Sequence, residues 1–437
     1  MLRLAEQAFL PSRVVATTAT AVAPLTTAPP PLQAIASATS RQSRIGLNAT
    51  NFFLAEVGGV ALPFANNHLR SQGWSFDEIG MASAMAGLGV LLMQVPAGVL
   101  VDRCAYRRGL LVGASLVVGI CYGMLPFWPA RGWSVAGMLF LAGVGHAFFG
   151  PLLGALALGL VGYERFNRTK GVNESWNHAG NLAAAVGAMV LVSYFGATAI
   201  FCAVTLASIL AVGAVLLIRP AELDEARAAG LSSQAAEGLA PPSLFSLLRD
   251  RRVAVLLAST ALFHLANAPA MPLVAMDVKH LGGSDRQVAA VVLVAQLVMI
   301  PVALAAAWLC DAWGRKRVLA VGFVALPLRI FLYSLAQTPA TLVALQTLDG
   351  IGAGIYGVAA VAMCADLTRG IGCFNSLVGL LAAALALGGV VGPPVAGIMV
   401  EHLGFAAAFQ VFAAIAAAAA ALFVCGMRDT RRSVGSA

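Results

Sequence analysis

The residues best suited to chemistry in this sequence are ionisable side chains that lie inside long apolar stretches. Glu56 lies in the stretch 45–67, which contains no Lys or Arg to pair with it. A carboxyl group in an apolar environment suits the binding and release of a proton, and ionisable residues in membrane helices usually have a function. We therefore interpret Glu56, with its neighbour Asn51, as a site of proton coupling or substrate binding. The alternative is a structural hydrogen bond from a neutral carboxylic acid.

A second set of ionisable residues consists of Arg329 and Asp349, at similar depths in the successive apolar stretches 318–336 and 341–366. A lone charge at the centre of a bilayer costs roughly 2.5–3.5 kcal/mol on insertion scales, and an opposite charge beside it offsets much of that cost. The two residues are thus expected to form a buried ion pair. The alternative, left open, is that one of them contacts an ionic substrate.

Polar residues also recur along one later stretch with the spacing i, i+3, i+4 and i+7, which places them on one helix face: Glu174, Asn177, His178 and Asn181. A polar stripe in a membrane helix must face protein or water, and an unperturbed histidine titrates near neutral pH. The stripe is interpreted either as the lining of a cavity mouth or as a contact with a neighbouring helix. His264 and Asn267 are weaker candidates for cavity-lining residues.

These side chains must be positioned by helices that cross a membrane. Hydrophobic residues make up 60% of the 437 residues and charged residues only 11%, whereas soluble domains carry about 25% charged residues. A spanning helix needs about 20 mostly apolar residues. The sequence predicts twelve such helices, at 45–67, 79–101, 109–128, 134–160, 172–194, 197–218, 253–276, 287–309, 318–336, 341–366, 375–399 and 404–427.

The basic residues predict how these helices are oriented. Most of the 27 lysines and arginines fall in loops and tails on one side, which places both termini in the cytoplasm. The exceptions are four residues on the outer side and one inside a helix: Arg70, Arg131, Lys279, Arg286 and Arg329. The expected organisation is a disordered cytoplasmic tail (1–44), a six-helix bundle (45–218), a cytoplasmic linker (219–252), a second six-helix bundle (253–427) and a cytoplasmic tail (428–437).

The two expected bundles are repeats of each other. Gly98-Val-Leu-Val-Asp102 matches Ala307-Trp-Leu-Cys-Asp311 at an offset of 209 residues, and Phe166-Asn167 matches Phe374-Asn375 at an offset of 208. Each copy holds six helices, so both copies have the same orientation. The axis that relates them then lies along the membrane normal.

With this topology and repeat, residues 45–427 resemble the major facilitator superfamily. The loop that carries the resemblance reads Gly98-x-x-x-Asp102-Arg103-x-x-x-Arg107-Arg108. The resemblance implies an all-α membrane fold of twelve helices in two pseudo-symmetric bundles, and a cytoplasmic gate formed by both copies of this loop: Asp102, Arg103, Asp311 and Arg315. A carboxylate at such a helix end either pairs with an arginine or faces the N-terminus of another helix. The alternative is that the basic residues only fix topology.

A glycine series in the stretch 375–399 resembles a motif of drug and proton antiporters. In that family the series belongs to the fifth helix, whereas the fifth helix here has Ala184-Ala185 where Gly-Pro is expected. We interpret three residues of the series as providing close helix packing and a kink: Gly388, Gly392 and Pro393.

The predicted function is secondary active transport of a small molecule by alternating access about a site near the midplane. Proton-coupled export is the expected mode, and the alternatives are proton-coupled or facilitative import of a metabolite and a non-transporting membrane receptor or scaffold. The expected partners are a small-molecule substrate, protons and the lipid of the cytoplasmic (inner) membrane, with no nucleic acid and with a monomer as the expected state.

Neither an enzyme nor a bound cofactor or metal is expected. The sequence has no Walker-type phosphate loop, its seven cysteines have no metal-ligand spacing, and its histidines and carboxylates form no pattern of a nucleophile with its base. A gradient of ions is therefore the expected source of energy.

Overall fold

A computed structural model describes residues 39–128, 132–196, 198–231 and 244–428. The expected tails, 1–44 and 428–437, thus lie mostly outside the described residues, as does the middle of the expected linker. The side chain of Glu56 is also outside the described part, although its backbone belongs to the first helix. The contacts given below all lie within one unit of the chain, Ala38–Ala437.

The first half of this unit consists of long helices joined by short turns. They are α1 (Arg41–Ser71), α2 (Phe76–Arg103), α3 (Arg107–Met124), the 3-10 helix η1 (Leu125–Phe127), α4 (Trp133–Ala147), α5 (Phe149–Phe195) and α6 (Thr198–Leu217). Three short elements follow in the connection to the second half: the 3-10 helix η2 (Pro220–Glu222), α7 (Glu225–Ala228) and α8 (Leu244–Arg249).

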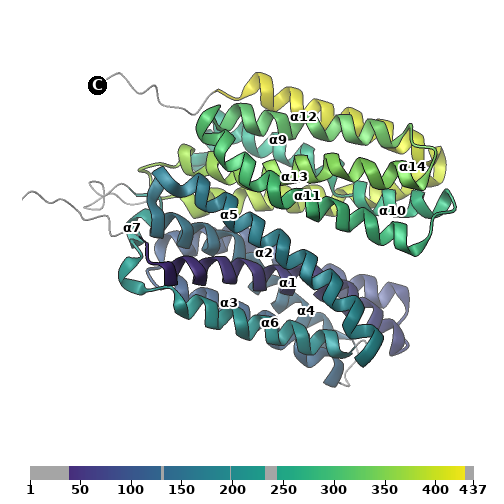
Figure 1. Cartoon of the computed structure of the whole chain (residues 1–437), viewed down its shortest axis with the longest axis horizontal. Helices are drawn as coiled ribbons and strands as arrows, with labels where there is room; N and C mark the ends of the chain where they lie inside the picture. The colour runs from purple at the N-terminus through teal and green to yellow at the C-terminus, as the bar shows by residue number, and fades with distance from the viewer. Residues whose placement is uncertain (1–38, 129–131, 197, 232–243, 429–437) are drawn as a thin grey trace, which may run out of the picture. The chain divides into compact units, whose positions relative to one another are not determined.

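The second half repeats this pattern. Its helices are α9 (Arg251–Asn267), α10 (Ala270–His280), α11 (Asp285–Ala312), α12 (Arg315–Tyr333), α13 (Pro339–Leu367) and α14 (Phe374–Gly426). In Figure 1 the purple-to-teal helices of the first half lie beside the green-to-yellow helices of the second, and α7 marks one end of the helices. We refer to this end as the α7 end.

The lengths and compositions of the helices fit a membrane protein with twelve crossings. Eight helical stretches among the described residues are long and apolar enough to span a membrane. Two of them, Trp133–Phe195 and Phe374–Gly426, are too long for one crossing and each contains a non-helical glycine, Gly162 (φ 68°) or Gly404 (φ 79°). Positive φ is readily adopted only by glycine, so each stretch provides two crossings. Helices α1 and α12 complete the twelve.

Two expected helices are interrupted. The stretch 134–160 is divided at Phe148, between the end of α4 at Ala147 and the start of α5 at Phe149. The stretch 253–276 was expected to be continuous, but the structure ends α9 at Asn267 and begins α10 at Ala270. Pro269 explains the break, because proline lacks the N–H that would continue the helical hydrogen bonds.

The repeat in the sequence is also seen in how equivalent helices begin. Ser75 begins α2 with a capping box, in which its hydroxyl accepts from the Glu78 N–H while the Glu78 carboxylate accepts from the Ser75 N–H. Ser284 and Gln287 form the same arrangement at the start of α11, 209 residues later. A capping box satisfies N–H groups that the first helical turn leaves unpaired, so equivalent helices begin at equivalent residues.

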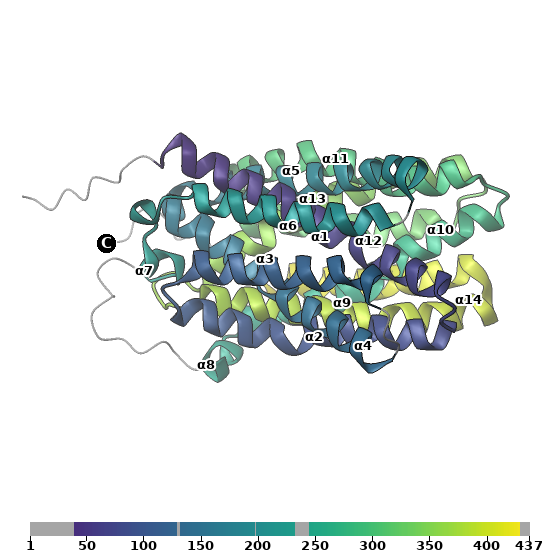
Figure 2. The same ribbon diagram turned by 90° about the horizontal axis from the view of Figure 1, so that it is seen from below.

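The two halves meet along two helix pairs, α2 with α14 and α5 with α11. Figures 1 and 2 both show α5 and α11 side by side. Small residues allow the close approach. A Cβ added at Gly379 would lie 2.5 Å from the Gln94 carbonyl oxygen, and one added at Gly171 would lie 2.5 Å from the Ala307 Cβ. At Gly98 an added Cβ would collide with the backbone of Asn375. Such small-residue contacts are how membrane helices pack closely.

These contacts predict which glycines tolerate a methyl group. Gly98→Ala and Gly171→Ala should each lower the free energy of unfolding by about 1–3 kcal/mol, since the added methyl overpacks the interface. Gly87→Ala lies in the same helix as Gly98 but has nothing within 4 Å of its Cβ position, so it should be neutral or slightly stabilising. Thermal unfolding of the purified variants in one detergent measures this. Equal melting temperatures for all three would contradict the close approach.

Candidate functional site

The first candidate site is the contact between Asp102, at the C-terminal end of α2, and the start of α14. The Asp102 carboxylate accepts hydrogen bonds from the backbone N–H groups of Asn375 (2.9 Å) and Ser376 (2.7 Å). It also accepts from the Asn375 side-chain amide (2.9 Å) and the Ser376 hydroxyl (2.5 Å). A carboxylate at a helix N-terminus satisfies unpaired N–H groups and complements the helix dipole. Of the two expected arrangements for Asp102, the structure contains the one with a helix N-terminus.

The repeat-related residues make the corresponding contact on the other side. The Asn167 side-chain amide in α5 donates to the Asp311 carboxylate at the end of α11, at 2.6 Å. Between the two contacts, the buried rings of Phe166 and Phe374 meet edge to face with centroids 5.7 Å apart. Because Phe166 and Phe374 are equivalent in the two repeats, the pseudo-symmetry axis passes between these rings.

The arginines of the two loops bind equivalent carbonyls but different carboxylates. Arg107, only 2% exposed, donates through Nε to the Val101 carbonyl at 3.0 Å. Arg315 donates to the Cys310 carbonyl at 3.5 Å, and its Nε pairs with Asp366 at 3.0 Å. Arg103 was expected at the gate, but it is exposed and is joined to no other described residue by a hydrogen bond or ion pair. Arg107, not Arg103, makes the buried arginine contacts at this end of α2.

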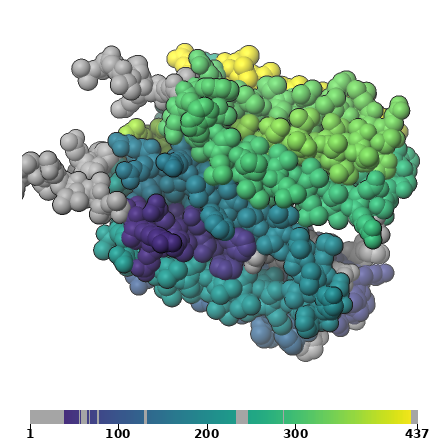
Figure 3. Space-filling model, in the orientation of Figure 1, coloured from purple at the N-terminus to yellow at the C-terminus, as the bar shows by residue number. Residues whose placement is uncertain are grey.

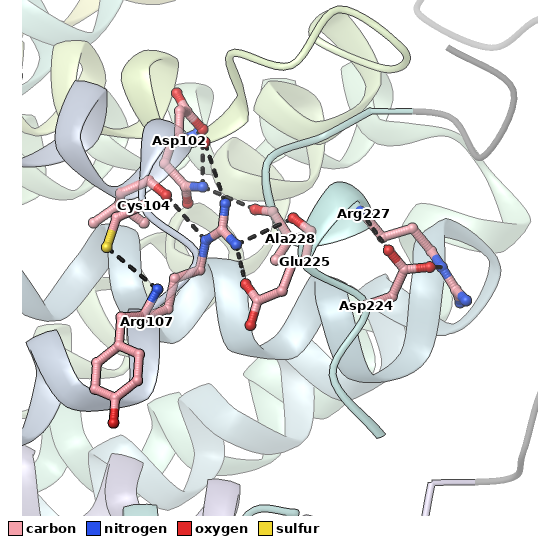
Figure 4. Close-up of polar contacts among 10 residues, drawn as sticks. Asp102, Cys104, Arg107, Asp224, Glu225, Arg227 and Ala228 are labelled. Atoms are coloured by element: carbon pink, nitrogen blue, oxygen red, sulfur yellow. Dashed lines mark hydrogen bonds and ion pairs between the residues drawn. The ribbon is translucent and has the colours of Figure 1, made fainter. Parts of the chain in front are cut away.

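The carboxylate that pairs with Arg107 comes from the connection between the halves. Glu225 in α7 forms an ion pair with Arg107, and Figure 4 shows the Arg107 guanidinium between the end of α2 and this short helix. In the second half, the corresponding acid, Asp366, belongs to α13. The residues at the corresponding place in the first half, Leu158 and Gly159, are uncharged, so Glu225 supplies the acidic partner that Arg107 would otherwise lack.

Residues 224–231, here called the linker strap, also join both halves at the α7 end. Towards the first half, the Asp224 N–H donates to the Gly159 carbonyl at 3.2 Å, and the Tyr163 hydroxyl donates to the Gly230 carbonyl at 2.9 Å. Towards the second half, the strap carbonyls accept from the Gly370 N–H (2.8 Å), the Phe374 N–H (3.3 Å) and the Asn375 amide (2.8 Å). The α7 end is therefore held together by the strap as well as by the two aspartates.

The polar face predicted on α5 faces the second half. His178 Nδ1 lies 3.0 Å from the Gln296 Oε1 of α11, and the Ser175 hydroxyl donates to the Ile300 carbonyl at 2.9 Å. Glu174 forms an ion pair with Lys170 and lies next to Gly357 of α13. The amide of Asn181 donates to that of Asn177 at 3.3 Å. The stripe thus lies between the halves, nearer the middle of the helices than the gate.

A cavity of about 310 Å³ lies within the second half, and four expected site residues line it: His264, Asn267, Arg329 and Asp349. Arg329 forms an ion pair with Asp349 and donates to the Asn267 side-chain oxygen at 2.5 Å. The side chains of Arg329 and Asp349 are 4% and 9% exposed. The structure therefore places His264 and Asn267 of α9 beside the expected pair of α12 and α13.

The remaining candidates lie in other places. Asn51 is buried in α1, where its amide donates to the Leu47 carbonyl at 2.8 Å, within the same helix. Gly388 and Gly392 face α9: an added Cβ would lie 2.5 Å from the Leu265 nitrogen and 2.6 Å from its carbonyl oxygen, respectively. Pro393 lies inside α14 without ending it.

Several residues of these sites were missed by sequence reasoning. The gate adds Asn375, Ser376 and Asn167, and the cavity adds Tyr333 and Gln346, whose side chains are 3.3 Å apart. The matched Phe-Asn pairs of the repeat were a usable signal for the first group, since they recur at the start of equivalent helices. No comparable signal pointed to Glu225, which lies in a stretch with the composition of a linker.

Comparisons with known proteins agree with this architecture. The model of the Major Facilitator Superfamily matches residues 46–273 and 256–436. An uncharacterised MFS-type transporter of Mycobacterium tuberculosis is 35% identical over 389 residues, 88% of this chain and 93% of that protein. Multidrug resistance protein 1 of Bacillus subtilis is 30% identical over 146 residues, 32% of this chain and 36% of that protein. The solved fucose:proton symporter of E. coli has the same fold, with a TM-score of 0.66 and 16% identity over 88% of this chain and 100% of that one.

The gate predicts how a native cysteine reacts when Asp102 loses its charge. Cys373 is buried beside the start of α14, and burial together with the charge of Asp102 raises the pKa of its thiol to about 11. Little of the reactive thiolate is therefore present at neutral pH. Asp102→Asn removes that negative charge and the charge-assisted hydrogen bonds. Losing these bonds costs at least about 1.5 kcal/mol, which shifts the equilibrium between the closed and open states of the proposed gate about tenfold towards the open state. Labelling of Cys373 should accelerate by about tenfold.

A soluble maleimide measures this labelling on protein in which Cys373 is the sole cysteine. Arg103→Gln is the matched control, because it alters an exposed charge at the same helix end that has no contact in the described structure. An unchanged labelling rate in Asp102→Asn would contradict a gate at this contact.

The ion pair of the cavity gives a second prediction. Asp349→Asn leaves the Arg329 charge buried without a counter-charge, which should lower the free energy of unfolding by about 3–5 kcal/mol. The double variant Arg329→Gln with Asp349→Asn removes both charges, so it should lie within about 1 kcal/mol of the native protein. Thermal unfolding of the single and double variants tests the pair, and a double variant that loses as much stability as Asp349→Asn would contradict it.

Proposed function

The chain belongs to the major facilitator superfamily, and we propose on this basis that it is a secondary active transporter that exports a small molecule in exchange for protons. Membership of this family of transporters, with twelve membrane-spanning helices in the fold of the family, agrees with the resemblance in the sequence and sets the chain apart from enzymes. Substrate, direction and coupling are the proposed part.

The observation that carries the proposal is the pair of repeat-related contacts at the α7 end. Asp102 with Asn375 and Asp311 with Asn167 join the two halves through side chains and helix ends. Such contacts open without unfolding either half, because the helices that bear them stay intact. Alternating access requires a gate of this kind, in which one half rotates against the other as the contacts break.

We propose that the α7 end faces the cytoplasm. The basic loops lie at this end, and short loops rich in Lys and Arg remain on the cytoplasmic side. The described conformation is then closed towards the cytoplasm. In the multi-pass arrangement proposed for the inner membrane, both termini lie on that same side.

The polar face of α5 and the cavity of the second half are the proposed route and binding region. His178 and Glu174 lie between the halves, and Arg329 with Asp349 lines the cavity beside His264. Glu56 in α1 is proposed as the proton-coupling carboxylate, from its place within an apolar helix. Export is supported by the partial similarity to Multidrug resistance protein 1.

Transport in everted vesicles with an acid interior tests the proposal. Compounds from a panel of cationic drugs, sugars and organic acids are added while a pH-sensitive dye reports the gradient. A transported compound should collapse the gradient with native protein but not with Glu56→Gln. Glu164→Gln is the matched control, because Glu164 is exposed in α5.

Each other outcome contradicts a defined part of the proposal. Flux that is equal in native protein and Glu56→Gln, with an unchanged gradient, would indicate facilitated diffusion or another coupling ion. A gradient that drives uptake into cells rather than extrusion would indicate an importer. Absence of flux for the whole panel with correctly folded protein would favour a membrane receptor or scaffold.

A further inference from the structure

A second cavity, of about 680 Å³, lies at the α7 end between α1 and α5, away from the gate. Four arginines line it: Arg41, Arg44, Arg165 and Arg168. We refer to it as the basic pocket. It has no part in the contacts between the halves, since α1 and α5 both belong to the first half.

The lining residues form two stripes with the same spacing. On α1 they follow i, i+3, i+4 and i+7 as Arg41, Arg44, Ile45 and Asn48, and on α5 as Arg165, Arg168, Thr169 and Val172. This spacing places each set on one helix face. Because α1 packs against α5, two stripes that begin with arginine pairs line one pocket.

The four arginines are unneutralised. In the described ranges no ion pair joins any of them to a carboxylate, whereas Arg107, Arg227 and Arg315 each have an acidic partner. All four are exposed. Figure 3 shows the first turns of α1, in purple, at the surface of the unit beside α5. The positive charge is thus accessible from outside the bundle.

Apolar side chains line the pocket beside the arginines. Ile45, Leu47, Leu160, Val161 and Val172 form its apolar wall. At 1.5 Å per residue, the seven residues from Arg41 to Asn48 or from Arg165 to Val172 cover about 10 Å along the helix axis. That distance leads from the head-group region of a bilayer into the region of the acyl chains.

We propose that the basic pocket binds an anionic phospholipid, with the phosphate at the arginines and the first part of an acyl chain along the apolar wall. Guanidinium groups bind phosphate oxygens through paired, charge-assisted hydrogen bonds. Basic pockets between helices at the edge of a membrane suit anionic head groups. A lipid accounts for the apolar wall, whereas a free phosphate ion would use only the arginines.

The competing explanation is that these arginines act only through their charge, by fixing the orientation of the chain. Arg249 and Arg251 provide the comparison. They are exposed at the same end, in and beside α8, and lie outside the basic pocket. Replacing either pair removes the same charge from the same side of the protein.

Native mass spectrometry of the full chain in detergent, with equal amounts of phosphatidylglycerol and phosphatidylcholine, tests the proposal. The native protein should retain phosphatidylglycerol preferentially. Arg165→Gln with Arg168→Gln should lower its retention by roughly tenfold, while Arg249→Gln with Arg251→Gln should leave it unchanged. Val172→Phe, which fills the apolar part and keeps every charge, should also lower retention.

The outcomes are decisive in both directions. Equal losses from the two arginine pairs would overturn the proposal in favour of diffuse charge. If the variant that lacks Arg165 and Arg168 does not fold, the test rests on Val172→Phe. Unchanged retention of phosphatidylglycerol by Val172→Phe would then overturn the proposal. Displacement of the lipid by glycerophosphate at the same concentration would show that the pocket recognises phosphate alone. Failure to displace it at large excess supports the lipid. None of these results depends on whether the protein transports anything.

Discussion

The start of a helix has N–H groups that its own backbone cannot satisfy, and the contact between the two halves depends on this constraint. At the start of α14 these groups donate to Asp102, a residue of the opposite half. The same carboxylate thereby completes a helix and holds two bundles together. Phe166 and Phe374 pack against each other on the symmetry axis, so a pair of equivalent residues forms the centre of the interface. An interface built from repeated elements is self-complementary, as in a two-fold symmetric dimer.

The two copies differ where the connection between the halves enters. In the second half Arg315 finds its acidic partner in α13, one of the spanning helices, whereas in the first half Arg107 pairs with Glu225 of α7. The pair of Arg315 with Asp366 therefore lies entirely within the second half. The pair of Arg107 with Glu225 involves the strap, which also accepts hydrogen bonds from Gly370 and Phe374 of the second half. The proposed gate is thus symmetric in the contacts of its aspartates and asymmetric in those of its arginines.

Much of this architecture could be predicted from the sequence, because apolar length, basic loops and the repeat are each determined by local composition. The gate aspartates followed from their position in a repeated loop, and the pairing of Arg329 with Asp349 followed from the cost of isolated charge in an apolar medium. The cavity around that pair could not be predicted, because it depends on which faces of α9, α12 and α13 meet. Glu225 could not be linked to Arg107 either, since 118 residues separate them and the linker has no periodic pattern. The interruption at Pro269 was missed because the residues around it remain apolar.

The strap has a consequence for the rate at which the proposed gate would close again. It is covalently continuous with both halves, so after its contacts break it stays near its binding residues at a high effective concentration. Rebinding is then an intramolecular step with little loss of translational freedom. A plug supplied by a separate molecule would have to diffuse back in every cycle. A strap that forms part of the chain makes closure a first-order process that does not depend on how much protein the membrane holds.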